Sequence, residues 1–164
     1  MLSDPVCGHA QRRDQFSRCA RAEETDTNGR HVSFDKILAL FRDCWCSFFL
    51  ALDAGLDPSL MLLRHMRADF PGEIRAGEIE ISLNVLATGR TSVRLELTAC
   101  QAGRQVAGFE GVFVRCHPAS GKPWELAGTE LSALSRYRIV GRRGRDTLTT
   151  TRAGRRLPPA TGPS

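Results

Sequence analysis

The chain has 164 residues, of which 41% are hydrophobic and 25% are charged, and its formal net charge is +5. This length predicts one domain with a sizeable core, and the composition excludes a wholly disordered or collagen-like chain. No run of about 18 apolar residues is present, so we expect no membrane span, and residues 1–11 lack the apolar stretch of a secretory signal. The six cysteines show no C-x-x-C spacing. We therefore expect no metal site and a cytoplasmic location.

The positive charge is concentrated at the C-terminal end. Residues 138–164 hold seven arginines against Asp146, a net of +6, whereas residues 1–137 carry a net of −1. We therefore predict a basic, disordered tail over 138–164, a nearly neutral domain over 15–137 and an irregular segment over 1–14. The domain has no basic stripe with interleaved aromatic residues, so a nucleic-acid partner is not expected.

The first half of the domain predicts a strand followed by a long helix. Residues 15–24 alternate loosely as a strand, and residues 25–29 are turn formers. From 33 to 54, apolar residues recur every three or four positions, with Ser33 as the N-cap and Gly55 after the last turn. The helix has apolar residues on most sides, which indicates that a sheet buries it.

The second half predicts four strands and a short helix. The strands are expected over 60–70, 78–85, 92–99 and 105–115, with hairpin turns at 89–90 and 102–104 and a helix over 131–137. Alternation with period two predicts an antiparallel sheet with one covered face. The long helix is the expected cover, and the domain is therefore α+β.

The segment before the long helix carries the candidate chemistry. Asp26 lies in a turn that contains Gly29, a few residues upstream of a buried helix. The N-terminal amides of a helix carry partial positive charge and can polarise a carbonyl oxygen. A carboxylate nearby can attack that carbonyl or activate a water against it. The pattern favours acyl transfer or hydrolysis, and an ordinary turn or cap role for Asp26 is the alternative.

The stretch from residue 24 to 41 resembles the start of the hotdog-fold acyl-CoA thioesterases of the 4-hydroxybenzoyl-CoA thioesterase type. Residues 26–29 match the family's Asp-x-x-Gly turn, and His31 and Val32 follow it. Residues 32–34 also resemble the Val-Tyr-Phe of enediyne polyketide thioesterases, which carry Asn where Asp26 stands. Weaker matches at 37–41, 67–71, 75–78, 89–92 and 122–126 extend the resemblance over residues 15–137.

The resemblance implies a hotdog fold, an antiparallel curved sheet wrapped around one long central helix, and a thioester hydrolase that needs no cofactor. Asp26 would be the nucleophile or the general base, and His31 belongs to the same motif. Arg30 is inserted between the turn and His31. The amides of Val32, Ser33 and Phe34 are therefore all candidates for the oxyanion site.

The resemblance also implies the substrate contacts and the assembly. The substrate would be an acyl-CoA or an acyl-carrier-protein thioester, bound at Gly29, with the acyl group near Phe34, Leu38 or Phe41. Arg90 and Ser92 lie in a hairpin that corresponds to a part near the pantetheine or its phosphates. Active sites in this family form between subunits, so a homodimer or homotetramer is implied.

Two alternatives use the same fold. The spacing of Asp26, Asn28 and His31 matches the Asp-x-Asn-x-x-His of hotdog (R)-enoyl-thioester hydratases, although Gly29 replaces their Pro and Ser33 replaces a later Asp or Asn. A non-catalytic protein that binds an acyl carrier is the other alternative, and the inserted Arg30 would favour it. The excess of Arg over Lys suggests a GC-rich genome, as in many polyketide-producing bacteria.

Overall fold

The computed structural model describes residues 15–22 and 32–139. The predicted segment 1–14 and nearly all of the predicted tail, 140–164, lie outside them. The described elements are β1 (Phe16–Ala22), α1 (Phe34–Ala51), the short 3-10 helix η1 (Pro58–Leu60), β2 (Met61–Asp69), β3 (Gly77–Thr88), β4 (Ser92–Gln101), β5 (Arg104–Arg115) and α2 (Gly128–Ser135).

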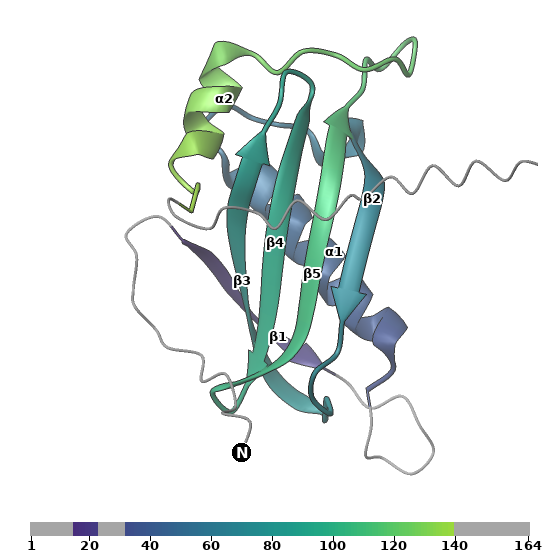
Figure 1. Ribbon diagram of the computed structural model, residues 1–164, viewed down its shortest axis with the longest axis vertical. Helices are drawn as coiled ribbons and strands as arrows, with labels where there is room; N and C mark the ends of the chain where they lie inside the picture. Colours follow the sequence, from purple (N-terminus) through teal and green to yellow (C-terminus); the bar gives the residue numbers. More distant parts are fainter. Residues whose placement is uncertain (1–14, 23–31, 140–164) are drawn as a thin grey trace, which may run out of the picture.

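The five strands form one antiparallel sheet in the order β1-β3-β4-β5-β2, and α1 lies along one face of it (Figure 1). This confirms the predicted α+β architecture of a curved sheet against one long helix. All five predicted strands are present. The second helix begins three residues earlier than predicted, because the carboxylate of Glu130 accepts a hydrogen bond from the amide of Ala127 and caps the first turn.

Alternating residues of the central strands form the sheet side of the core. Leu83 lies opposite Leu97 and Val85 opposite Leu95, and all four are completely buried. The helix contributes five buried residues: Ile37, Phe41, Cys44, Phe48 and Phe49. Leu50 on the same helix is 68% exposed. The sheet therefore covers one side of α1, and the expectation of burial on most sides is only partly met.

An aromatic cluster fixes the helix to β5. Trp45 stacks on Phe109 with ring centroids 5.1 Å apart, and it meets the edge of Phe113 at the same distance. Phe49 packs edge-on against Phe113 at 5.6 Å. Gly111 lies between the two strand phenylalanines, and a Cβ atom there would stand 2.7 Å from the ring of Phe109. Position 111 therefore favours glycine, because the rings of Phe109 and Phe113 occupy the space that a side chain there would need.

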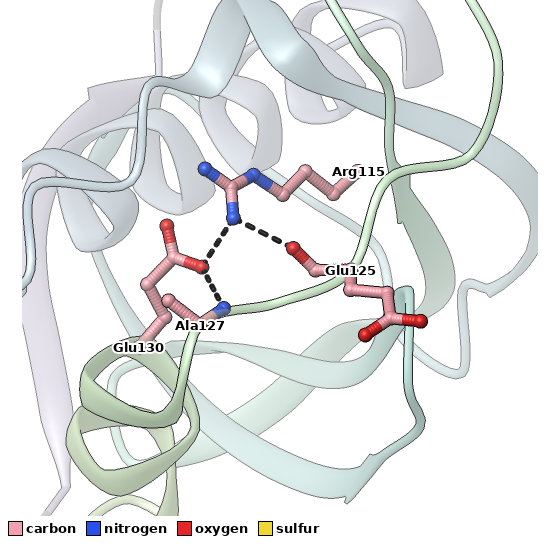
Figure 2. A network of polar contacts seen from close by, with 4 residues as sticks. All are labelled: Arg115, Glu125, Ala127 and Glu130. Carbon is pink, nitrogen blue, oxygen red and sulfur yellow. Dashed lines mark hydrogen bonds and ion pairs between the residues drawn. The ribbon is translucent and has the colours of Figure 1, made fainter.

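A buried ion pair joins α2 to the end of β5 (Figure 2). The guanidinium of Arg115 donates hydrogen bonds to the Glu130 carboxylate at 2.5 Å and to the carbonyl of Glu125 at 2.9 Å. The side chains of Arg115 and Glu130 are only 14% and 7% exposed. The guanidinium also lies 4.1 Å from the centre of the Trp124 ring. These contacts hold α2 and the preceding connection against the end of the sheet.

We expect Phe113→Ala to lower the free energy of unfolding by about 3–5 kcal/mol, because it leaves a cavity beneath Trp45 and Phe49. Leu50→Ala is the matched control on the exposed side of α1, and its effect should stay within about 0.5 kcal/mol. Urea unfolding of both variants measures the difference. Equal losses in the two variants would contradict this description of the core.

Glu130→Gln should destabilise the protein by about 3 kcal/mol, because it leaves the Arg115 guanidinium buried without its counter-charge. The control is Glu125→Gln, whose side chain is 63% exposed and pairs with Arg90 at the surface. That control should change stability by less than about 1 kcal/mol. Thermal and urea unfolding measure both, and a harmless Glu130→Gln would show that the pair does not hold α2.

Candidate functional site

The start of α1 is held by a contact with the segment before β3. The backbone amide of Val32 donates a hydrogen bond to the carbonyl of Ile74 at 3.1 Å, and both residues are buried. Ser33 follows in an extended conformation as the N-cap residue, and its hydroxyl does not cap the helix. Because the Val32 amide already donates to Ile74, the amides of Ser33 and Phe34 are the predicted oxyanion donors that remain.

Asp35 occupies the first turn of the helix. The Ser33 hydroxyl donates a hydrogen bond to its carboxylate and lowers the pKa of that carboxyl below its ordinary value. The amides of Asp35 and Lys36 also bond this carboxylate, and the positive charge of Lys36 acts in the same direction. The first turn of α1 is therefore an environment that stabilises negative charge, as the end of a helix should be.

The amide of Phe34 differs from its neighbours in the first turn. Among the described residues, none accepts a hydrogen bond from it. The Phe34 side chain is 64% exposed, so the surface around this amide is open. A carbonyl oxygen that reaches the start of α1 can therefore accept from the Phe34 amide without displacing a partner from residues 15–22 or 32–139.

The predicted acyl contacts differ in accessibility. Leu38 is half-buried, one turn beyond the exposed Phe34. Phe41 is completely buried and packs against Phe109 with ring centroids 5.7 Å apart. The core therefore explains why residue 41 is apolar. Of the three predicted acyl contacts, only Phe34 and Leu38 are accessible to a ligand.

Arg90 and Ser92 lie at the other end of the sheet. They flank the turn between β3 and β4, whereas Val32 is bonded next to the beginning of β3 (Figure 1). A strand of this length separates the two ends by about 35 Å. Arg90 pairs with Glu125 at 3.2 Å on the surface. Within one chain, the structure does not bring this hairpin to the start of α1.

The remaining predicted site residues, Asp26, Gly29 and His31, lie outside the described residues. Within residues 15–22 and 32–139, no group of three or more His, Cys, Asp or Glu side chains could hold a metal ion. No helix in this part of the chain is long and apolar enough to cross a membrane.

The sheet face away from α1 carries a polar hollow that the sequence reasoning missed. It is open, has a volume of about 160 Å³, and its polar lining includes Arg67, Asp69, Glu96 and Glu110. Glu96 and Glu110 are directly opposite each other in β4 and β5. The guanidinium of Arg94 bonds the carboxylate of Glu110, with 2.6 Å between Nε and Oε1. Period-two alternation in the sequence marks these positions as polar but does not show which of them are neighbours.

Asp35→Asn tests the electrostatics of the helix start. Because the folded pKa of Asp35 is lowered, its ionised carboxylate contributes stability above the ordinary Asp pKa, and this contribution is lost as the pH falls through the folded value. The stability difference between parent and variant should therefore be present at pH 7 and vanish in acid. Asp43→Asn, exposed on the middle of α1, is the control, and unfolding at pH 3 to 7 is the measurement. A difference that does not change with pH would contradict this role.

No protein-family model and no curated protein matches the sequence, but solved structures match the fold. One is a predicted thioesterase from Bacillus stearothermophilus, 18% identical, with a TM-score of 0.69 over 76% of this chain and 97% of that chain. Another is the dynemicin thioesterase, known from structures with bound polyene, at 20% identity and a TM-score of 0.67 over 78% of this chain and 100% of that chain.

A third similar structure is a Thermus thermophilus thioesterase in complex with coenzyme A and zinc. It is 20% identical, with a TM-score of 0.60 over 71% of this chain and 90% of that chain. At these identities the likeness concerns the fold. The strand order, the antiparallel pairing and the helix along one face agree with it. The chain therefore has the hotdog fold that these thioesterases share.

Proposed function

We propose that the protein hydrolyses an acyl thioester at the start of α1, with Asp26 as nucleophile or general base. The observation that carries this proposal is the amide of Phe34, which has no acceptor among the described residues and lies in a helix turn that favours negative charge. Asp26 belongs to the segment directly upstream of this turn. The thioesterases that share the fold support the reaction class.

The reaction requires a polarised carbonyl and an attacking oxygen. The thioester carbonyl accepts a hydrogen bond from the helix start, and the oxygen of Asp26, or of a water deprotonated by Asp26, adds to the carbonyl carbon. The carbonyl electron pair moves to the oxygen held by the Phe34 amide. When the pair returns, the carbon–sulfur bond breaks, and the thiolate takes a proton. When water attacks, the acid forms at this step; when Asp26 attacks, the acyl group stays on Asp26 as an anhydride, which a water then cleaves. Either route consumes one water and releases a carboxylic acid and a thiol.

The proposed substrate is an acyl-CoA or an acyl-carrier-protein thioester whose acyl group contacts Phe34 and Leu38. The exposure of Phe34 supports contact with a ligand or with another subunit. We propose a homo-oligomer, a dimer or a tetramer, in which a second copy brings Arg90 and Ser92 to the site, because one chain holds them at the far end of the sheet. We also propose that the protein acts in the cytoplasm and within polyketide biosynthesis, and the likeness to the dynemicin thioesterase supports the second of these proposals.

Release of free thiol from a panel of acyl-CoA and acyl-carrier thioesters tests the proposal. Asp26→Asn should lower the rate by at least about 100-fold, because it removes the nucleophile or base. His31→Ala should change it little, and Asp43→Asn, exposed on the middle of α1, is the control for loss of a carboxylate.

Two other results would contradict hydrolysis. Water addition to a crotonyl thioester that needs both Asp26 and His31 would indicate a hydratase. Binding of acyl carriers with no turnover of any thioester would indicate a non-catalytic protein.

A further inference from the structure

A single peptide group links the start of α1 to the end of β4. The planar unit between Ile74 and Arg75 directs its carbonyl to the Val32 amide, at 3.1 Å. The N–H of this trans peptide points the opposite way, and it donates a hydrogen bond to Oε1 of Gln101 at 3.1 Å. One chain of hydrogen bonds therefore runs from the side chain of Gln101, through this peptide, to the amide two residues before α1.

The side chain of Gln101 also holds the next peptide. Its Nε2 donates to the carbonyl of Arg75 at 2.8 Å, and it donates a longer hydrogen bond to the carbonyl of Glu78 at 3.5 Å. A primary amide carries both a donor and an acceptor, so it can pair with a backbone residue as a neighbouring strand would. Because Gln101 bonds both the N–H and the C=O of Arg75, neither adjoining peptide can turn without breaking a hydrogen bond.

This side chain acts where the strand pairing stops. The pairing of β3 with β4 begins with Glu80 opposite Cys100. β4 ends one residue later, at Gln101, and the chain then turns into β5. The backbone of β4 therefore ends before it could pair with residues 75–78, and the amide of Gln101 takes its place.

The side chains of this segment fix its position but not the direction of the Ile74 carbonyl. The Ile74 side chain is buried in the core. Arg75 forms an ion pair with Glu73 at 3.2 Å, but these side chains are 73% and 44% exposed, and such surface pairs contribute little. A peptide plane can rotate about the dihedral angles on its two sides while the side chains stay in place. The direction of the carbonyl therefore depends on the hydrogen bonds of the peptide itself.

We infer that Gln101 is a positioning residue for the start of α1. It orients the Ile74 carbonyl, which holds the Val32 amide and, through it, the two amides that follow. Hydrogen bonds in such a chain polarise one another, so the bond accepted by Gln101 strengthens the bond accepted by Ile74. The effect on catalysis rests on the proposed function, whereas the effect on the helix start rests on these hydrogen bonds alone.

Amide hydrogen exchange, followed by NMR, tests the positioning without any turnover. Gln101→Ala should raise the exchange rate of the Val32 amide about tenfold relative to the amides in the middle of β4, because two hydrogen bonds that orient its acceptor are lost. The amides of β4 report global unfolding, so the ratio separates a local release from a general loss of stability. An unchanged ratio would overturn the inference.

The matched control is Gln105→Ala. This variant removes an equally half-buried glutamine from the neighbouring strand β5, where residue 105 lines the polar hollow. It should leave the exchange ratio of the Val32 amide unchanged. A rise equal to that of Gln101→Ala would overturn the assignment to Gln101.

Gln101→Glu tests the donation to the Arg75 carbonyl. The ionised side chain accepts from the Arg75 amide but has no proton to donate, whereas the protonated acid donates. The Val32 exchange rate of this variant, divided by that of the parent at the same pH, should therefore be raised at pH 7 and return to about one as the pH falls through the pKa of the new carboxyl. A ratio that does not change with pH would also overturn the inference.

Thiol release tests the effect on catalysis. Measured well below the unfolding midpoints of both proteins, Gln101→Ala should lower kcat about tenfold and leave KM within about twofold, because a displaced amide loses contact with the oxygen that gains charge in the transition state. An unchanged kcat together with faster exchange at Val32 would overturn the positioning role. A parent chain that hydrolyses no thioester would contradict the proposed function, and the exchange ratios would still decide whether Gln101 holds the start of α1.

Discussion

The contact between the aromatic side of α1 and the apolar face of the sheet is the interaction on which the structure depends. Trp45, Phe49 and their two partners on β5 pack where Gly111 leaves room for rings. Removal of this apolar area from water is the main stabilising contribution of such a core. Because the helix is held along its middle, its first turn is fixed near Ile74 at one end of the sheet, and the polar groups of that turn have a defined position.

The two ends of the sheet have different characters. At the end where β5 finishes, which we call the closed end, the buried ion pair of Arg115 and Glu130 holds α2 against the sheet. At the end where α1 begins, the exposed Phe34 and the available amide leave the surface open. The proposed chemistry at the helix start depends on rigid elements, and the aromatic contacts of α1 with β5 hold the helix in place. The hairpin of Arg90 lies at the opposite end of the sheet from the start of α1, so it cannot reach the proposed site within its own chain.

The sequence predicted the fold, whereas Asp26, Gly29 and His31 of the candidate site lie outside the described residues and stay a prediction. Alternation at residues 79–85 and 93–99 predicts the strands because one face is buried, and the three-to-four spacing after Ser33 predicts the helix. The start of α2 was missed because Ala127 is not a usual capping residue, and Glu130 does the capping instead. The engagement of Val32 by Ile74 joins residues 42 positions apart, which no local pattern shows. The burial of Phe41 and the exposure of Leu50 likewise depend on where the sheet lies, so helical spacing alone could not separate them.

The positions of Trp45 and Trp124 have an optical consequence. They are the two tryptophans of the chain. Trp45 projects from α1 and packs against the rings of Phe109 and Phe113. Trp124 is 40% exposed, with the Arg115 guanidinium over its ring and the His117 ring beside it. The indole emission of the first reports the integrity of the core, and that of the second reports the closed end. Replacing each in turn by phenylalanine would give the protein single fluorophores, with which local opening of one end can be separated from global unfolding.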